Sequence, residues 1–192
     1  VALDLRIHGG LPQRRERLFM IAVRKDIYDF NPFISIPIAK SSTSLSEILS
    51  KNEDDDPELY LDKDSKYHDE MWDGAVDSGE LVDDFQLVQY RKTKPRIIEA
   101  GICPTLTQNM GAGGHNVPFY LDKVRSQFRK LSVKQCLALQ GFPTSFKFPN
   151  EVSNGAKYRM IGNSVSPVIA NLVAKAILDF LNENEDELEL AV

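Results

Sequence analysis

The sequence predicts a mixed α/β fold, on the strength of two apolar strands and one amphipathic helix. Apolar residues alternate with more polar ones over residues 1–7, and a second apolar stretch covers residues 18–23, so both are interpreted as strands. Two strands joined by a loop are typical of the edge of an α/β sheet. From Val168 to Leu181 apolar positions recur at the three- and four-residue spacing of a helix that packs by one broad face.

The composition is that of a globular protein with an uneven charge distribution. Of its 192 residues 42% are hydrophobic and 27% are charged, and the net charge is −5. Residues 44–90 hold 15 acidic and 3 basic side chains, and residues 180–192 hold 5 acidic and none basic. The remaining residues therefore hold 8 acidic and 20 basic side chains. Such a basic body can bind a polyanion, although solvated faces of both signs would have the same composition.

Several classes of protein and site are not expected. No run approaches the roughly 18 apolar residues of a membrane span, and no signal peptide is visible. We therefore expect no membrane partner and a cytoplasmic location. The three histidines are isolated from one another and from the cysteines, so no metal site is predicted.

The two cysteines, Cys103 and Cys136, are expected to be free thiols without a catalytic role. They are far apart in the sequence, and neither lies beside a histidine that could activate it. Cys136 shares a predicted helical face with Val133, Leu137 and Gln140, so we expect it to pack as a small hydrophobic residue.

Arginines enter the second strand after a loop that contains two glycines. In a strand, Arg15 and Arg17 would fall on the same face because side chains alternate. Two adjacent guanidinium groups need an anionic or acceptor partner, such as a carboxylate, a phosphate or a base edge. An internal ion-pair network with Glu16 is equally compatible with this pattern.

The middle of the chain changes in character near residue 91. Before it, Ser44–Glu47 has the form of a capping box at the start of a short helix, and residues 85–90 suggest a strand. After it, a basic run leads into residues 101–118, which are rich in glycine, threonine and asparagine. Such a segment lets backbone approach a phosphate chain or a groove closely, but a long surface hairpin has a similar composition.

The last third of the sequence is predicted to contain two helices, the second of which is the amphipathic helix from Val168 to Leu181. Ser132–Gln135 forms a second capping box, its helix runs to about Gln140, and Gly141 stops it. A small aromatic core is expected from Phe142, Phe146 and Phe148.

The stretch from Lys157 to Pro167 is interpreted as a segment with basic and aromatic side chains that leads into a Gly-Asn-Ser turn. Asn163 or Ser164 would cap the following helix, and Pro167 suits its first turn. Free N–H groups at that end suit either a polar ligand or a plain cap. The acidic tail from Asn182 is expected to fray.

Four separated segments resemble, in order, motifs of the bacterial-type DNA (cytosine-5) methyltransferases. Residues 12–17, Pro-Gln-Arg-Arg-Glu-Arg, resemble the Gln-x-Arg-x-Arg motif of that family, and residues 103–118 resemble the end of its target-recognition domain. Residues 129–143 are similar to the next motif, with Lys134 and Gln135 in place of the more usual Arg-Glu pair. Residues 162–167 resemble the last motif, with a serine where a first proline is commoner.

This resemblance implies the C-terminal portion of a Rossmann-like S-adenosylmethionine-dependent methyltransferase with a small, irregular, mostly β target-recognition domain. Residues 1–31 would form edge strands of the catalytic sheet, and residues 32–127 the target-recognition domain. Residues 128–182 would form helices that return to the catalytic domain, and residues 183–192 an acidic tail.

The implied reaction transfers a methyl group from S-adenosylmethionine to carbon 5 of a cytosine flipped out of a specific duplex sequence, in a restriction-modification system. Flipping is needed because the stacked base cannot be attacked, and a cysteine thiolate adds to carbon 6 to activate the ring. The alternatives are a non-catalytic DNA-binding or regulatory remnant of the family and a transfer-RNA cytosine-5 methyltransferase.

The resemblance also assigns roles to residues. Arg17 would hydrogen-bond the extruded cytosine, Arg15 would help to hold the catalytic loop and a phosphate, and Gln13 would support both. The S-adenosylmethionine pocket would be lined by Asn163, Ser164 and Val165. Contacts to DNA would come from Thr105, Thr107, Gly113, Gly114, His115 and Asn116.

Motifs that the family needs are not found in these 192 residues. They are the Pro-Cys nucleophile, the Glu-Asn-Val motif and the Phe-x-Gly-x-Gly cofactor loop, all of which precede residue 1 in the family order. We therefore expect this chain to be inactive alone. Its partners would be double-stranded DNA and an N-terminal half, on the same or a separate polypeptide, which also completes the S-adenosylmethionine pocket.

Overall fold

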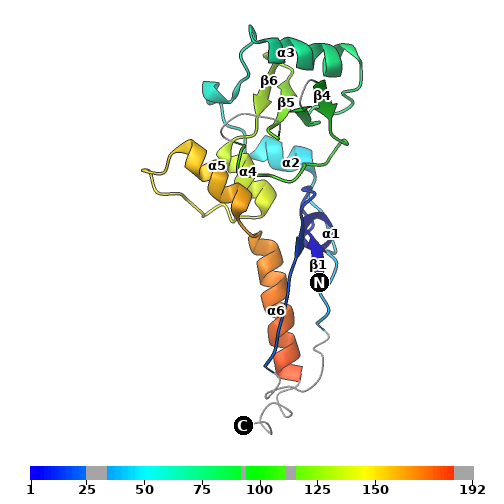
Figure 1. The fold of residues 1–192 in the computed structure, drawn as a ribbon, viewed down its shortest axis with the longest axis vertical. Helices are drawn as coiled ribbons and strands as arrows, with labels where there is room; N and C mark the ends of the chain where they lie inside the picture. The colour runs from blue at the N-terminus through cyan, green and yellow to red at the C-terminus, as the bar shows by residue number, and fades with distance from the viewer. Residues whose placement is uncertain (25–33, 92–93, 111–115, 184–192) are drawn as a thin grey trace.

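The computed structural model describes residues 1–24, 34–91, 94–110 and 116–183, which form a head on a narrow stalk (Figure 1). The stalk consists of β1 (Ala2–Asp4), α1 (Leu5–Gly9), β2 (Glu16–Leu18) and α6 (Pro167–Glu183). The head consists of α2 (Leu45–Lys51), the 3₁₀ turn η1 (Pro57–Leu59), α3 (Lys66–Met71), the π-helical turn η2 (Trp72–Asp77), β3 (Val88–Arg91), β4 (Lys94–Ile97), β5 (Pro118–Asp122), β6 (Gln127–Lys130), α4 (Val133–Gln140) and α5 (Asn154–Asn163).

The first strand is shorter than the alternating sequence predicts. The carboxylate of Asp4 accepts hydrogen bonds from the backbone N–H groups of Arg6, at 2.7 Å, and Ile7, at 3.4 Å, and so caps helix α1. The strand expected over residues 1–7 is therefore wrong beyond Asp4. Strand β2 pairs with β1 in antiparallel register and ends at Leu18, so most of the strand expected over residues 18–23 is also wrong.

Helix α6 confirms the amphipathic pattern. Ile169 and Val173 pack against Leu3 and Leu5 in one buried cluster along the stalk. Within the described residues, the stretch Asn154–Glu183 is by length and composition a candidate for a membrane span, with a mean hydropathy of 1.5 over 18 residues, contrary to expectation. One such stretch is weak evidence for a membrane span, because the core helix of a soluble protein has the same length and composition. Here the stretch is also divided between α5 and α6.

The head contains a four-stranded antiparallel sheet in the order β4-β3-β5-β6. One face carries Val88 and Phe128, which pack with Met71 and Ala75 of α3 and η2. Residues 32–127, which were expected to be mostly β, thus contain helices as well as strands. The last strand, β6, begins at the end of that range and belongs to the same sheet.

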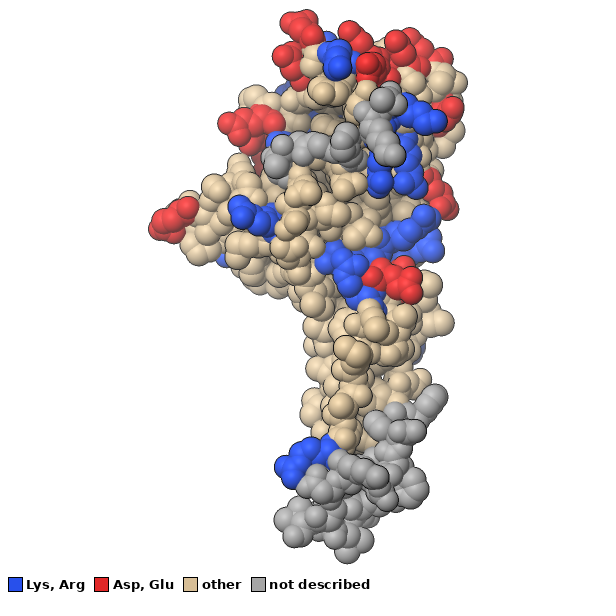
Figure 2. All heavy atoms as spheres, in the orientation of Figure 1, with Lys and Arg blue, Asp and Glu red and all other residues tan. Residues whose placement is uncertain are grey.

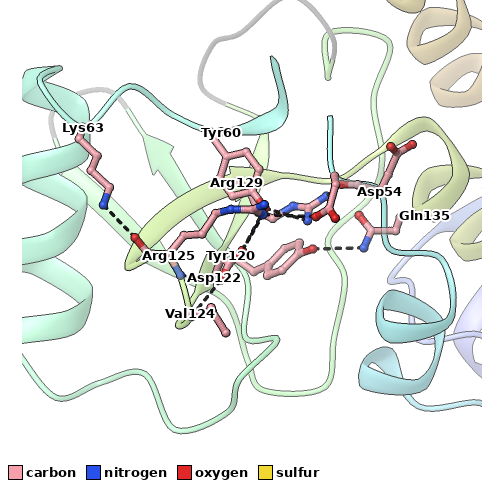
Figure 3. Close-up of polar contacts among 10 residues, drawn as sticks. Asp54, Tyr60, Lys63, Tyr120, Asp122, Val124, Arg125, Arg129 and Gln135 are labelled. Carbon is pink, nitrogen blue, oxygen red and sulfur yellow. Dashed lines mark hydrogen bonds and ion pairs between the residues drawn. The ribbon is translucent and has the colours of Figure 1, made fainter. Parts of the chain in front are cut away.

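A stacked arginine links this sheet to the helices below it (Figure 3). The buried guanidinium of Arg129 lies between the rings of Tyr60, at 5.1 Å, and Tyr120, at 5.3 Å. It donates a hydrogen bond to the backbone oxygen of Asp54. Gln135 of α4 donates to the Tyr120 hydroxyl at 3.3 Å, so the sheet is tied to α4 through buried polar groups.

The capping predictions hold in part. Ser132 and Gln135 form the expected reciprocal capping box of α4, and Gly141 ends that helix with a left-handed φ of 84°. The three expected aromatic rings do meet around Phe146, with ring-centroid distances of 4.8 and 5.1 Å, but Phe146 is exposed, so the cluster lies at the surface rather than forming a core. The expected turn before α6 is different: residues 154–163 form helix α5, and Ser164 caps its C-terminus rather than the N-terminus of α6.

Candidate functional site

Gln13 is the centre of a buried junction between three segments. Its side-chain amide donates to the backbone oxygen of Leu139 at 2.9 Å and to the side-chain oxygen of Gln140 at 2.8 Å. Its own oxygen accepts from the backbone N–H of Leu106 at 3.2 Å. Because Gln13 is fully buried, all three bonds are shielded from water, and they fix the segment before β2 against α4 and against residues 103–106.

Arg15 extends this junction to the last motif. Its guanidinium donates to the backbone oxygens of Leu106 at 3.0 Å, Gly162 at 3.1 Å and Ser164 at 2.7 Å. Burial, with the nearby positive charge of Arg17 as a second cause, lowers the pKa of Arg15 to about 10. Within the described chain its hydrogen bonds go to neutral carbonyls rather than to Glu16, so Arg15 acts there as a positioning residue.

Gln140 is a member of this junction that the sequence-based site prediction missed. Its amide nitrogen donates to the backbone oxygens of Ile161 and Ser164, both at 3.2 Å, and to the Ser164 hydroxyl at 3.1 Å. A signal was present, since Gln140 is a polar residue on an otherwise apolar helical face. Such a residue is buried only when its hydrogen bonds are satisfied.

Gly162 permits the close approach that these bonds require. A Cβ atom at position 162 would lie 2.2 Å from the carbonyl carbon of Thr107 and 2.4 Å from the backbone nitrogen of Gln108. The end of α5 therefore rests directly on the backbone of residues 107–108. Only glycine fits there without moving one of the two segments.

Arg17 and the last motif border the same small depression in the stalk. This depression is lined by Arg15, Arg17, Val165 and Ser166, together with apolar residues of β1, α1, α6 and the segment after β2. Arg17 is exposed, and among the described residues its guanidinium donates a hydrogen bond to the neighbouring Glu16 carbonyl oxygen at 2.7 Å. The Arg17 side chain is therefore accessible from solvent beside Val165.

The three residues assigned to the cofactor differ in how they are placed. Ser164 is committed to the buried junction, because its hydroxyl donates to the Ile161 oxygen at 2.7 Å. Asn163 is exposed and its amide lies 3.4 Å from the side-chain oxygen of Gln108. Val165 is 54% exposed. Asn163 and Val165 thus present one polar and one apolar side chain to the outside.

Three of the six residues assigned to DNA border a second hollow, here called the basic groove. Its volume is about 350 Å³, and it lies between the junction and the sheet of the head. It is lined by Arg14, Gln89, Arg91, Arg96, Ile97, Ile98, Glu99, Ile102, Pro104, Thr105, Thr107 and Asn116. Figure 2 shows Lys and Arg side chains following one another down this side of the head toward the stalk.

Three of the predicted DNA-contacting residues belong to the groove. Thr105 donates to the backbone oxygen of Arg14 at 2.6 Å, and Asn116 accepts at its backbone oxygen from Gln89 at 2.9 Å. The hydroxyl of Thr107 is buried without a hydrogen-bond partner in the described structure. The other three predicted residues, Gly113, Gly114 and His115, lie outside the described residues.

The two thiols of the chain are not placed to act as nucleophiles. Cys103 and Cys136 are free and fully buried, and burial raises the pKa of both thiols. Across the described ranges, no group of three or more His, Cys, Asp or Glu side chains could hold a metal ion.

We predict that neither thiol of the folded chain reacts measurably with Ellman's reagent at pH 8, because a thiolate would have to form in an apolar interior. Both should react at once in denaturant. Rapid labelling of either cysteine in the folded chain, with circular dichroism showing no unfolding, would contradict the burial of that residue.

Comparison with known proteins gives a consistent result along the chain. Residues 7–179 match the family model described as C-5 cytosine-specific DNA methylase. The Type II methyltransferase M.Bsp6I of Bacillus sp. (strain RFL6) is 30% identical over 91% of this chain and 53% of its own length. The Type II methyltransferase M1.ScrFI of Lactococcus lactis subsp. cremoris is 27% identical over 92% of this chain and 42% of its own length.

Solved structures show the same fold. The Entamoeba histolytica methyltransferase EhMeth superposes on 94% of this chain with a TM-score of 0.58 and 14% identity. The S. pombe Dnmt2 methyltransferase superposes on 95% of it with a TM-score of 0.57 and 15% identity. This chain covers 53% and 56% of those two proteins, so it spans about half the length of the proteins that it matches.

Proposed function

Because this chain belongs to the C-5 cytosine-specific DNA methylase family, we propose that it is the target-recognition portion of a DNA (cytosine-5) methyltransferase. The proposed enzyme methylates carbon 5 of a flipped cytosine in a specific duplex sequence, as part of a restriction-modification system. Residues 32–127 would form the target-recognition domain, between strands and helices of the catalytic domain. A bacterial-type restriction-modification enzyme acts on DNA in the cytoplasm, so a cytoplasmic location is proposed.

One observation carries this proposal. The buried guanidinium of Arg15 bonds to Leu106 and to the Gly162–Ser164 segment, and so joins three sequence motifs that are far apart in the chain. The consequence is that Arg17 and Val165 border one depression. A reaction between a base and a methyl donor needs the residues that bind them to border a common space.

Arg17 is proposed to donate hydrogen bonds to the carbonyl oxygen of the extruded cytosine. Its exposed guanidinium has donors to spare, since its hydrogen bond to the neighbouring Glu16 carbonyl oxygen uses one nitrogen. Arg15 would hold the strand that carries Arg17 in register with the last motif. Gln13 would hold Gln140, and Gln140 would hold Ser164.

The residues at the end of α5 fit one wall of an S-adenosylmethionine pocket. Asn163 offers an amide to polar groups of the ligand, and Val165 offers apolar surface beside it. Ser164 would act through the backbone position that Arg15 and Gln140 fix. When bound, S-adenosylmethionine supplies the transferred methyl group.

The other walls of the pocket and the nucleophilic thiolate are proposed to come from an N-terminal half, on the same or a separate polypeptide. Support comes from the thiols of this chain, which are fully buried, and from its coverage of about half of its relatives. Duplex DNA is favoured over transfer RNA as the substrate because the quoted curated relatives are Type II methyltransferases.

The proposal is tested by mixing the purified chain with a polypeptide that carries the missing motifs of a close relative. Duplex DNA and methyl-labelled S-adenosylmethionine are added, and the DNA is digested to nucleosides. We expect 5-methylcytosine from the mixture and none from either part alone. DNA binding without methyl transfer, for several such halves that are active with their own partners, would favour the non-catalytic remnant instead.

A further inference from the structure

The two faces of the β3–β4 hairpin differ sharply. Val88 and Tyr90 of β3 and Ile97 of β4 pack in the apolar cluster beneath α3 and η2. Because side chains alternate along a strand, the opposite face carries the intervening residues. They are Gln89, Arg91, Lys94 and Arg96, and three of these four border the basic groove.

Among the described residues, the positive charges on this face and along its groove outnumber the carboxylates beside them. Arg91 lies directly opposite Lys94 across the strand pair, an arrangement that is destabilising for like charges. Neither Lys94 nor Arg96 forms an ion pair with another described residue. The one carboxylate that lines the groove, Glu99, is 2.9 Å from Arg14. A face that keeps such charges together suits an anionic ligand.

Gln89 anchors this face. It is 2% exposed, its amide nitrogen donates to the Asn116 backbone oxygen at 2.9 Å, and its oxygen lies 3.5 Å from a guanidinium nitrogen of Arg91. Gln89 therefore orients Arg91 and holds the end of the glycine-rich segment at the same time. Arg91 and Arg96 are both exposed, so their guanidinium groups are accessible.

The groove continues into the proposed catalytic region. Arg14 precedes Arg15 in the chain, and its backbone oxygen accepts from Thr105. A duplex lying along the groove would therefore reach from the β3–β4 hairpin to the junction held by Arg15. The major groove of B-DNA, about 12 Å wide, admits a two-stranded β-ribbon such as the β3–β4 hairpin.

We propose that Arg91 and Arg96 read guanine in the major groove of the target sequence, with Lys94 bound to a phosphate. The inference rests on the proposed function and adds to it a base that the target contains. Paired arginine donors match the O6 and N7 acceptors of guanine, which no other base presents in that arrangement. A lysine bound to a phosphate adds affinity for DNA without a preference for any base, because its charge contacts only the backbone.

The test uses the two-part enzyme and a library of duplexes with randomised positions around a cytosine. Methylated duplexes are sequenced for the wild type and for Arg91→Ala, Arg96→Ala and Lys94→Ala. We expect the wild type to prefer guanine at defined positions. Each arginine variant should lose this preference at one position and should bind the preferred duplex roughly tenfold or more weakly than the wild type does. Lys94→Ala should weaken the binding of preferred and of scrambled duplexes by the same factor.

Two controls separate the possible failures. Arg125→Ala removes an arginine that lines a different hollow, on the β5–β6 turn, and should leave the preference unchanged. Replacing the preferred guanine by 7-deazaguanine removes the N7 acceptor without changing the protein, and should weaken wild-type binding.

If the wild type methylates no duplex, the proposed function fails. If it methylates with a guanine preference that both arginine variants retain, the guanine assignment alone is overturned. Unchanged wild-type binding to the 7-deazaguanine duplex overturns it too, whether or not the variants fold.

Discussion

Replacing Arg17 with Ala is expected to lower methyl transfer by the two-part enzyme by about 10²–10³-fold, the cost of losing one donor aimed at charge that develops in a transition state. The exposed guanidinium of Arg17 borders the depression that Val165 also lines. S-adenosylmethionine binding should change little, because Asn163 and Val165 are untouched. Turnover is measured with saturating DNA, and cofactor binding by calorimetry.

The matched control is Arg6→Ala, which removes an exposed arginine from α1 in the same stalk. This variant should keep wild-type turnover. Arg17→Lys keeps the charge but loses the planar pair of donors, so it should restore only part of the activity. Wild-type turnover in Arg17→Ala would show that Arg17 does not contact the reacting base.

Replacing Gly162 with Ala is expected to destabilise the chain by at least about 2 kcal/mol, which is typical of overpacking in a close-packed interior. The added methyl group would lie 2.2 Å from the backbone of Thr107. Relief of this clash must separate α5 from residues 107–108, which pulls apart the two carbonyls that Arg15 bonds, on Leu106 and Gly162. The free energy of unfolding is measured by urea titration.

Gly155 provides the control in the same helix. A Cβ atom at position 155 has nothing within 4 Å, so Gly155→Ala should stabilise the chain by up to about 1 kcal/mol through helix propensity. The two substitutions are chemically identical and are predicted to have opposite signs. If Gly162→Ala also stabilises the chain, α5 does not rest on residues 107–108.

Much of the fold could be predicted from local chemistry. The apolar stripe of α6 and the capping box of Ser132 depend on neighbours a few residues away, and both are confirmed. The family could also be predicted, because four motifs occur in the right order. The boundaries were harder: Asp4 uses its carboxylate to start a helix inside an alternating pattern, and that choice depends on packing against α6.

The site was only partly predictable for a related reason. Residue types and spacing pointed to Arg15, Arg17 and the residue 163–165 segment, but not to what each contacts. Gln140 enters the site through partners 21 to 24 residues away, and Arg91 and Arg96 share a hollow with Arg14 through the tertiary fold. Their roles as direct contacts to base and cofactor remain predictions.

The central claim is that Arg15 brings the base-binding and cofactor-binding residues to one place. Its most direct test is a peptide map of two photolabels in the two-part enzyme: duplex DNA with 5-iodocytosine at the target position, and methyl-labelled S-adenosylmethionine. We predict that, on this chain, the base labels the segment around Arg17 and the cofactor labels the segment around Asn163–Val165. Base labels confined to surfaces remote from the Arg15 junction, or cofactor labels absent from the end of α5, would contradict it.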